Sequence, residues 1–121
     1  MGAANALIID RSGKPVIVYT KEDWTNKTLR LLHCGDANCT PSGISDTLID
    51  SGASDILSPS LVLDVHDNPV SSYGKLSNGP QSIKFFHCND ANCTGGDDIP
   101  AVIATNGYGS SVKLDRTGNP V

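Results

Sequence analysis

Hydrophobic and polar residues alternate in short stretches along the whole chain, and no stretch keeps the 3.6-residue apolar period of a helix for long enough to form one. Clusters of Gly, Pro, Asn, Asp and Ser separate these stretches, as is usual between strands. The pattern therefore predicts an all-β protein with about four short strands in each repeating unit. The predicted strands are 6–10, 15–20, 29–34, 47–50, 60–64, 69–73, 82–88, 99–105 and 111–115.

The predicted strands recur because the sequence itself repeats. Segment 31–40, with its His-Cys pair, returns as 85–94, at a spacing of 54 positions (87 − 33 = 54 for the histidines). Segment 9–16 returns at the same spacing as 63–70 and again as 114–121. Such a period is typical of solenoids, propellers and arrays. We therefore divide the chain into unit 1 (1–59), unit 2 (60–110) and the start of a third unit (111–121).

Composition narrows the partners that the chain is expected to have. Only 38% of the 121 residues are hydrophobic, and the formal net charge is −4. Nucleic-acid binding requires clustered Lys and Arg on one face, which the sequence lacks. No apolar run approaches the ~18–20 residues of a membrane helix, and no basic and apolar leader is visible at the start. We expect neither nucleic acid nor membrane insertion.

Segments 10–15, 64–69 and 115–120 predict the same structural turn. An Asp side chain can accept a backbone N–H two residues later, Gly supplies a positive φ, and Pro sets φ for the next strand. Unit 2 has Asp67 at the glycine position, which Asp tolerates better than most residues. The predicted turn residues are Asp10, Gly13, Pro15, Asp64, Asn68, Pro69, Asp115, Gly118 and Pro120.

A calcium loop is the alternative interpretation of these turns. Calcium takes six to eight oxygen ligands, whereas each turn offers one obvious carboxylate. The structural turn is the better account, and we expect no metal and no cofactor there.

All four cysteines lie in the two copies of a C-x4-C loop, as Cys34 with Cys39 and Cys88 with Cys93. Two local disulfides would close these loops and indicate an oxidising compartment. A joint zinc site remains an alternative, although C-x4-C is at the limit of zinc-ligand spacing. Covalent haem attachment is excluded, because no His follows Cys39 or Cys93. The pairing within each repeat favours disulfides.

The histidines predict structure rather than catalysis. His33 and His87 precede the first cysteine of each pair, and we expect each ring nitrogen to reach a loop carbonyl. His66 has no counterpart in unit 1 and is expected to be a solvated turn residue. No nucleophile elbow, phosphate loop or metalloprotease motif occurs. The sequence therefore offers no catalytic residue.

Segment 60–73 resembles the blade repeat of bacterial secreted β-propellers. Those repeats combine a small-Leu-Ala-Leu-Asp stretch, a Gly-Asn-Pro turn and a strand that ends in Tyr, followed by a Leu-Lys-rich strand, here 83–86. The resemblance covers nearly the whole chain and implies a β-propeller-like fold, with four antiparallel strands per 51–54-residue unit and a secreted setting. This chain departs from the family by its two-cysteine loop, and it holds fewer than the four blades a propeller needs. The resemblance implies no activity.

Three classes of function remain open. The first is a non-catalytic extracellular scaffold or interaction module, at the cell surface or secreted. The second is a carbohydrate-binding propeller, for which Trp24, Tyr19, Tyr73 or Tyr108 could stack on a sugar, although Trp24 has no counterpart in unit 2 and is expected to pack in the core or at an edge. The third is a propeller hydrolase or lyase. The scaffold is favoured.

Three positions, Asn26, Asn38 and Asn92, match the N-glycosylation pattern, which carries little weight in a bacterial protein. The repeat also predicts an assembly. Two blades cannot close a ring, and an open stack would expose unpaired strand edges. Either the chain is part of a longer propeller, or another copy supplies the missing strand pairing. We favour a homo-oligomer or filament that forms through the terminal strands, with 111–115 among them.

Overall fold

The structure is a computed structural model that describes residues 4–96, 98–107 and 109–121. It confirms the all-β prediction: the chain forms two four-stranded antiparallel sheets, each a meander of sequential strands. The first sheet contains β1 (Asn5–Ile9), β2 (Pro15–Asp23), β3 (Asn26–His33) and β4 (Ser45–Ala53). The second contains β5 (Asp55–Leu63), β6 (Pro69–Leu76), β7 (Ser82–His87) and β8 (Ala101–Thr105). Among the described residues, one 3₁₀ turn, η1 (Pro41–Gly43), interrupts this pattern.

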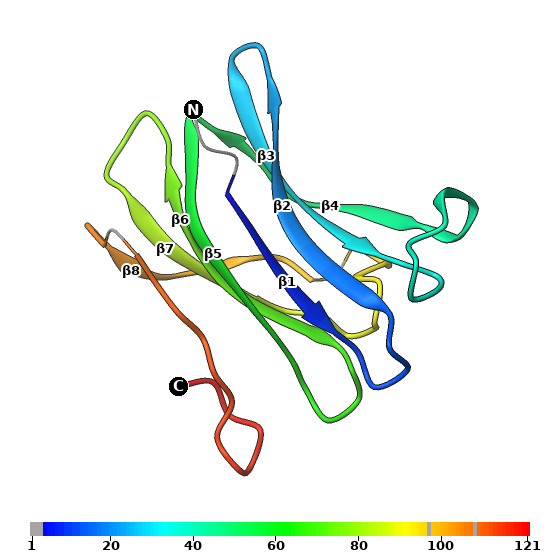
Figure 1. The fold of residues 1–121 in the computed structure, drawn as a ribbon. Coiled ribbons are helices and arrows are strands. Elements are labelled where there is room, and N and C mark those ends of the chain that lie inside the picture. Colours follow the sequence, from blue (N-terminus) through cyan, green and yellow to red (C-terminus); the bar gives the residue numbers. More distant parts are fainter. Residues whose placement is uncertain (1–3, 97, 108) are drawn as a thin grey trace.

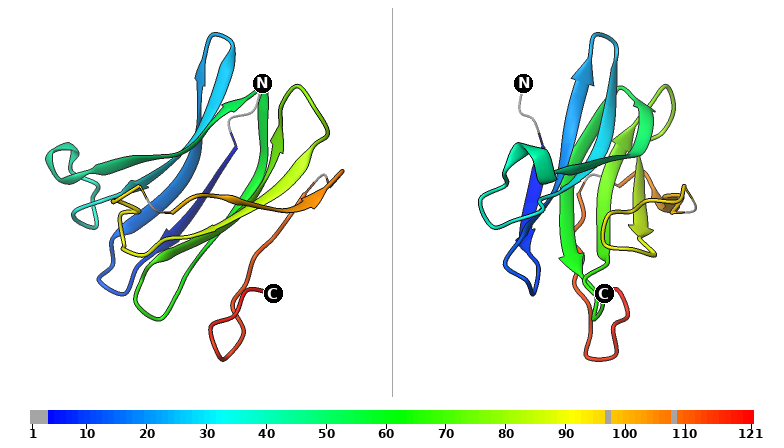
Figure 2. Two further views of the ribbon diagram at one scale, coloured as in Figure 1. Left: turned by 180° about the vertical axis from the view of Figure 1, so that it is seen from behind. Right: turned by 90° about the vertical axis from the view of Figure 1, so that its right-hand side faces the viewer.

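The two sheets lie next to each other with β1 beside β5 (Figure 1). Strands β4 and β8 form the outer edges of their sheets (Figure 2). The order of the strands and their register are the same in both sheets: Val16 pairs with His33, and 54 positions later Val70 pairs with His87. Each repeat unit therefore corresponds to one sheet, and the units stack in one direction.

Side chains alternate between the two faces of each sheet. We call the side that points from unit 1 toward unit 2 the forward face, and the opposite side the rear face. Six residues define the forward face of unit 1: Ala6, Ile8, Val16, Val18, Leu29 and Leu31. Six residues define the rear face of unit 2: Leu61, Leu63, Ser71, Tyr73, Phe86 and Cys88.

The hydrophobic core lies between these two faces. Val16, Val18, Leu29 and Leu31 are fully buried in one cluster with Leu61, Tyr73 and Phe86 of the other sheet. The rings of Tyr73 and Phe86 are 6.3 Å apart at a tilt of 59°, a favourable aromatic pair. Each fully buried aliphatic side chain contributes roughly 1.5–3 kcal/mol relative to exposure, so the contact between units is the main source of stability.

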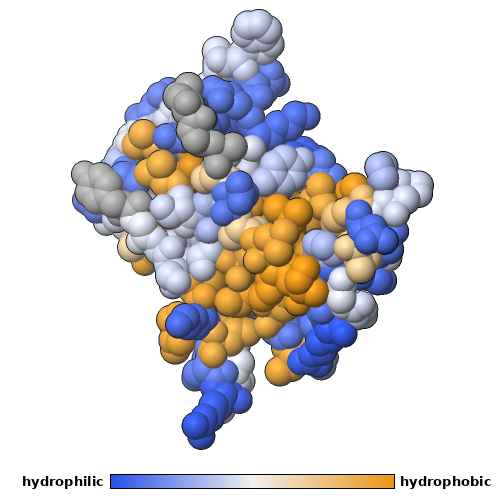
Figure 3. All heavy atoms as spheres, viewed as in Figure 1, coloured by the Kyte–Doolittle hydropathy of each residue, from blue (hydrophilic) through white to orange (hydrophobic). Residues whose placement is uncertain are grey.

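The rear face of unit 1 has no sheet packed on it in the described part of the chain. Its residues are Leu7, Ile9, Ile17, Tyr19, Leu32 and Cys34, each 54 positions before a member of the rear face of unit 2. Leu7 is 58% exposed, whereas its counterpart Leu61 is buried. A continuous apolar area is visible over β1 and β2 (Figure 3). Equivalent positions in the two units therefore have opposite environments.

Several observed strands differ in their bounds from the predicted ones, such as β4 (Ser45–Ala53 rather than 47–50), and two further differences change the local structure. Strand β5 begins at Asp55 rather than at Ser60, because a bulge with Ser58 at φ 45° lets the chain continue in the sheet. The predicted strand 111–115 is wrong as a strand. Residues 113–121 instead close a small hairpin of their own, in which Lys113 and Val121 exchange backbone hydrogen bonds around the Leu114–Pro120 bridge.

The predicted Asp turns are confirmed, and five turns rather than three share the geometry. In each turn one carboxylate oxygen accepts the backbone N–H groups two and four residues later, and the backbone carbonyl accepts the N–H three residues later. The five aspartates are Asp10, Asp36, Asp64, Asp90 and Asp115. The residue three positions after each has positive φ: Gly13 (82°), Cys39 (53°), Asp67 (63°), Cys93 (51°) and Gly118 (84°).

The cysteine loops are therefore the same turn with a disulfide added. Cys34 is bonded to Cys39, and Cys88 to Cys93, as predicted, so no thiolate is left for a zinc site. The second cysteine of each pair occupies the strained position where the other turns have Gly or Asp. Two disulfides indicate an oxidising, extracellular-type environment.

Replacing Gly13 with Val should destabilise the chain by roughly 1–2 kcal/mol, because a β-branched residue resists positive φ. A Cβ at this position would have no atom within 4 Å, so the loss would come from the backbone alone. Urea unfolding measures it. Gly13→Asn is the matched control, since Asn tolerates this conformation, and it should lose clearly less. Equal losses in both variants would contradict the explanation.

Candidate interface between the repeat units

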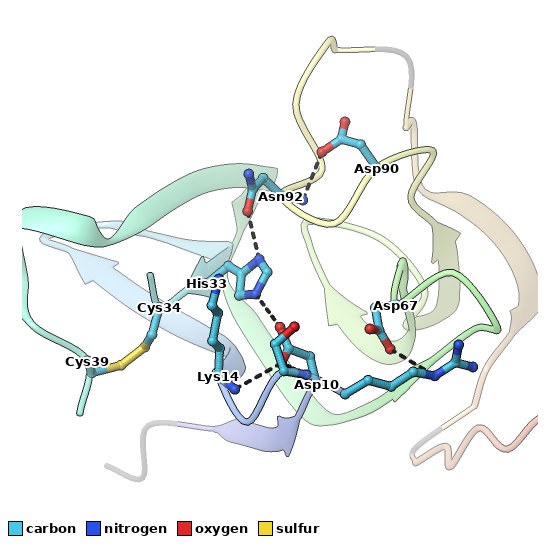
Figure 4. Close-up of polar contacts among 10 residues, drawn as sticks. Asp10, Lys14, His33, Cys34, Cys39, Asp67, Asp90 and Asn92 are labelled. Atoms are coloured by element: carbon cyan, nitrogen blue, oxygen red, sulfur yellow. Dashed lines mark hydrogen bonds and ion pairs between the residues drawn. A yellow bond between two sulfur atoms is a disulfide. The ribbon is translucent and has the colours of Figure 1, made fainter. Parts of the chain in front are cut away.

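His33 links the two units through side chains. Its Nε2 lies 3.0 Å from Oδ2 of Asp10 in the first turn of unit 1, and its Nδ1 lies 2.7 Å from Oδ1 of Asn92 in unit 2 (Figure 4). Both partners are acceptors, so the arrangement is complete when both ring nitrogens carry hydrogen. The prediction of a loop-carbonyl partner is therefore wrong: the partners are a carboxylate and an amide side chain.

The loop that carries Asn92 is built to hold it in place. The backbone N–H of Asn92 donates to Asp90, and the Cys88–Cys93 disulfide closes the loop around it. The carbonyl of Asn92 also accepts the hydroxyl of Thr47 on β4, at 2.8 Å. Asn92 thus bonds to unit 1 through both its side chain and its backbone. We call the set His33, Thr47 and Asn92 the His–Asn staple.

The carboxylate of Asp10 has two tasks at once. One oxygen holds the turn, and the other accepts His33. Burial favours its neutral form, but the hydrogen bonds from the backbone of Lys14 and Ser12 and from His33 outweigh this and lower the pKa of Asp10. Asp64 repeats the arrangement in unit 2, with His87 Nε2 at 2.8 Å, and its pKa is lowered in the same way.

A second polar cluster crosses the interface around Asp50 on β4. Its Oδ2 accepts Tyr73 Oη at 2.6 Å and Lys84 Nζ at 2.9 Å, and its Oδ1 accepts Lys75 Nζ at 2.8 Å. All three donors belong to unit 2. The Asp50 side chain is only 12% exposed, so this carboxylate is held by a nearly complete shell of donors.

The titration of this cluster follows from its geometry. Burial works against the charge on Asp50, but the hydrogen bonds from Lys75, Tyr73 and Lys84 prevail and lower the pKa of Asp50 to about 2. Burial and the Asp50 carboxylate both raise the pKa of Tyr73 far above its ordinary range. Asp50 is therefore a carboxylate and Tyr73 a neutral phenol at ordinary pH.

Unit 1 has the equivalent donors but a different acceptor. Tyr19 and Arg30 stand 54 positions before Tyr73 and Lys84. Both bind Asp46 of their own sheet: Tyr19 Oη lies 2.9 Å from Oδ2, and Arg30 Nε lies 2.9 Å from Oδ1. Arg30 is thus paired within unit 1 and Lys21, the counterpart of Lys75, is exposed, whereas Lys75 and Lys84 on the rear face of unit 2 bind Asp50 of the neighbouring unit.

The predicted site residues have structural positions. The turn residues lie in three separate turns, and the carboxylates of Asp10, Asp64 and Asp115 are engaged by backbone N–H groups. Hydrogen bonds from the Thr117 hydroxyl and from the backbone of Asn119 and Thr117 lower the pKa of Asp115 to about 2. No group of three or more His, Cys, Asp or Glu suited to a metal occurs among the described residues.

Two surface hollows lie beside the interface. One of about 290 Å³ lies between β4 and the 93–100 segment, with Asp50, Ser51 and Lys84 on its wall. The other, of about 230 Å³, lies by the β2–β3 turn. Trp24 on its rim is 98% exposed, so the expected packing of this ring is wrong. Tyr108, the other candidate for sugar stacking outside the strands, lies outside the described residues.

Residue types alone did not reveal the staple and the Asp50 cluster, although one signal was present. Asp36-Ala37-Asn38-Cys39 and Asp90-Ala91-Asn92-Cys93 have the spacing of the Asp turns, which places the Asn at a fixed point of each loop. Asp50 has no such signal, because its counterpart in unit 2 is Ala104. Its role depends on which sheet packs against it.

Comparison with protein-family models, with curated proteins and with solved structures gave no match. Within the described part of the chain, no helix has the length and apolar character needed to cross a membrane. Inference about function therefore depends on the interface itself.

Replacing Asn92 with Ala should destabilise the chain by about 1–2 kcal/mol, because His33 would lose its acceptor in a mostly buried position. Chemical denaturation measures the loss. The matched control is Asn38→Ala, at the equivalent position of unit 1, where the exposed side chain makes no hydrogen bond within the described residues; its change should stay within about 0.5 kcal/mol. Equal effects would show that the staple contributes nothing.

Replacing Asp50 with Asn should lower the free energy of unfolding by about 2 kcal/mol near neutral pH, because two amines lose their counter-charge. Asp46→Asn, on the more exposed equivalent cluster, should cost less than about 1 kcal/mol.

The loss at Asp50 should depend on pH. The folded-state pKa of about 2 lies below the ordinary 3.8, so the stabilisation is present above pH 4 and disappears as the pH falls toward 2. Denaturation curves of wild type and Asp50→Asn should therefore converge in acid. A constant difference across this range would contradict the assignment.

Proposed function

We propose that this chain is a non-catalytic extracellular module, secreted or at the cell surface, whose blade-like units stack into a larger assembly of the β-propeller type. The observation that carries the proposal is the contact between units. It buries the forward face of one sheet against the rear face of the next and adds the His–Asn staple and the Asp50 cluster.

The same contact supports self-association. The terminal elements are β1, which belongs to unit 1, and residues 111–121, which lie over unit 2 (Figure 1). Leu7 and Ile9 expose apolar surface on one side, and Ile103 on the other. Apolar patches of this kind mark interaction sites in soluble proteins. A homo-oligomer or filament that forms through the terminal elements would cover them.

A carbohydrate-binding module is the second candidate. The fully exposed ring of Trp24 lies beside Glu22, Asn26 and Asp55 at the second hollow. An exposed aromatic ring next to carboxylate and amide groups is suited to the apolar face and the hydroxyls of a sugar. This candidate is compatible with assembly, because the β2–β3 turn projects away from the sheet contact (Figure 1).

The mass of the full chain in solution tests the proposed assembly. Light scattering over a range of concentrations should show particles larger than one chain that grow with concentration, because the apolar faces are buried by association. A folded monomer at every concentration would contradict self-assembly.

A glycan array with the same protein tests the second candidate. Binding that is lost in Trp24→Ala and kept in Trp24→Phe would favour the carbohydrate-binding module. If no glycan on the array binds, the carbohydrate-binding module is excluded and the scaffold remains.

A further inference from the structure

The two open faces of the stack carry complementary halves of the contact that joins the units. Leu7 on the rear face of unit 1 is the counterpart of Leu61, which is buried in the core between the sheets. Ile103 on β8 is the counterpart of Ile49, which packs against the same core, yet Ile103 is 59% exposed. Leu7 and Ile103 are thus exposed although their counterparts lie in or against the core, whereas Val70 and Ile83 on the forward face of unit 2 are already buried.

A hollow lies between the forward face of unit 2 and the hairpin 111–121. The hollow measures about 190 Å³ and is almost entirely apolar, with Phe85, Ile103 and Val112 on its wall. The equivalents of Phe85 and Ile103 in unit 1 are Leu31 and Ile49, which belong to or pack against the core cluster that contains Tyr73 and Phe86. The hollow therefore marks apolar surface of unit 2 that the hairpin leaves uncovered at the place where a following unit would pack.

The His–Asn staple has two unfilled halves. His87 repeats His33: its Nε2 is bound to Asp64, and its Nδ1 makes no hydrogen bond within the described residues. Asn38 repeats Asn92 in a loop of the same geometry, and its side chain is exposed. His87 lacks the amide partner that His33 has, and Asn38 lacks the histidine partner that Asn92 has. They lie on opposite open faces.

The charges on the two faces permit the contact. A unit that packs on the rear face of unit 1 would meet Tyr19 and Arg30, which Asp46 already satisfies. At the position of Asp50, unit 2 has Ala104, so no carboxylate is offered there. Arg30 would keep Asp46 as its partner in the contact, and Lys21, the exposed counterpart of Lys75, would keep its charge in solvent at the edge.

We propose that the rear face of unit 1 docks on the forward face of unit 2 in a second copy of this chain, with Asn38 of one copy bound to His87 of the other. This inference rests on the proposed function, and it identifies the two surfaces through which the copies would associate. The two faces differ, so the contact is head-to-tail and gives a ring or a filament.

The hairpin 111–121 competes for this contact. It corresponds residue by residue to 6–16 and lies over unit 2, where the backbone N–H of Val112 donates to Ser60 Oγ. Val112 is the only buried residue among 111–121, whereas β5 in the equivalent place contributes both Ile56 and Leu61. The hairpin is thus weakly held, and β1 of the incoming copy displaces it.

Sedimentation velocity on the full chain and four variants tests the proposal. Leu7→Glu blocks the rear face of unit 1, and Ile103→Glu blocks the forward face of unit 2. Leu48→Glu and Val102→Glu are matched controls on exposed positions of the same sheets. Val102 remains exposed on the rear face of unit 2 although unit 1 covers that face, so it and its counterpart Leu48 lie outside the contact.

Wild type and both controls should associate, whereas each blocked variant alone should be a monomer. An equimolar mixture of Leu7→Glu and Ile103→Glu retains one intact pair of faces, so it should form dimers that do not grow further. Association in the Leu7→Glu or Ile103→Glu variant alone, or a mixture that stays monomeric, overturns the proposed surfaces while self-assembly stands. A wild type that is monomeric throughout overturns both proposals.

Two further variants test the staple and the hairpin. Asn38→Ala should weaken association about five-fold, the loss of one net hydrogen bond, without lowering the stability of the monomer. Val112→Ser, which loosens the hairpin, should strengthen association. Unchanged association in Asn38→Ala, or weaker association in Val112→Ser, overturns that part of the proposal.

Discussion

The Asp turn is the constraint on which the rest of this structure depends. A carboxylate oxygen that accepts two backbone N–H groups, two and four residues later, fixes the direction in which the chain leaves each strand. The turn needs one residue at positive φ, so Gly is favoured at that position in the turns that no disulfide closes. The turn recurs in five places, so a single local interaction sets both the strand hairpins and the cysteine loops.

The second oxygen of the same carboxylate makes a contact with a residue far away in the sequence. In the turns that precede β2 and β6 it accepts a histidine from the end of the third strand of the sheet. This contact orients the histidine ring so that its other nitrogen points out of the sheet toward the next unit (Figure 4). The cysteine loop of that unit presents Asn92 to it. Turn chemistry in two units thus positions both halves of one contact.

Much of the fold could be predicted from the sequence, and the reason is local. Strand alternation, the positions of the turns and the pairing of cysteines depend on neighbours in the chain, and the structure has them where the pattern places them. The strand at 111–115 failed because a strand needs a neighbouring sheet, and residues 113–121 pair only with each other. The partners of His33 and the role of Asp50 depend on how the sheets stack, which no local pattern contains.

The exposed position of Trp24 illustrates the same limit. An aromatic residue in a chain with few of them is expected to be buried, but a two-residue turn with Trp24 at positive φ directs its ring into solvent. The ring of Trp24 therefore contributes nothing to the core. Sequence periodicity has no means of distinguishing the two cases.

Neighbouring units in a stack of repeats bury each other's faces, which explains why equivalent positions in units 1 and 2 differ. In the described part of the chain, the rear face of unit 2 has such a neighbour and the rear face of unit 1 has none. Unit 1 adapts by binding Arg30 to Asp46 within its own sheet, which removes the need for a neighbour's charge. Its apolar residues cannot be satisfied in the same way, because only another surface can bury Leu7 and Ile9. Arg30 therefore has its counter-charge within its own sheet, whereas Leu7 and Ile9 remain exposed.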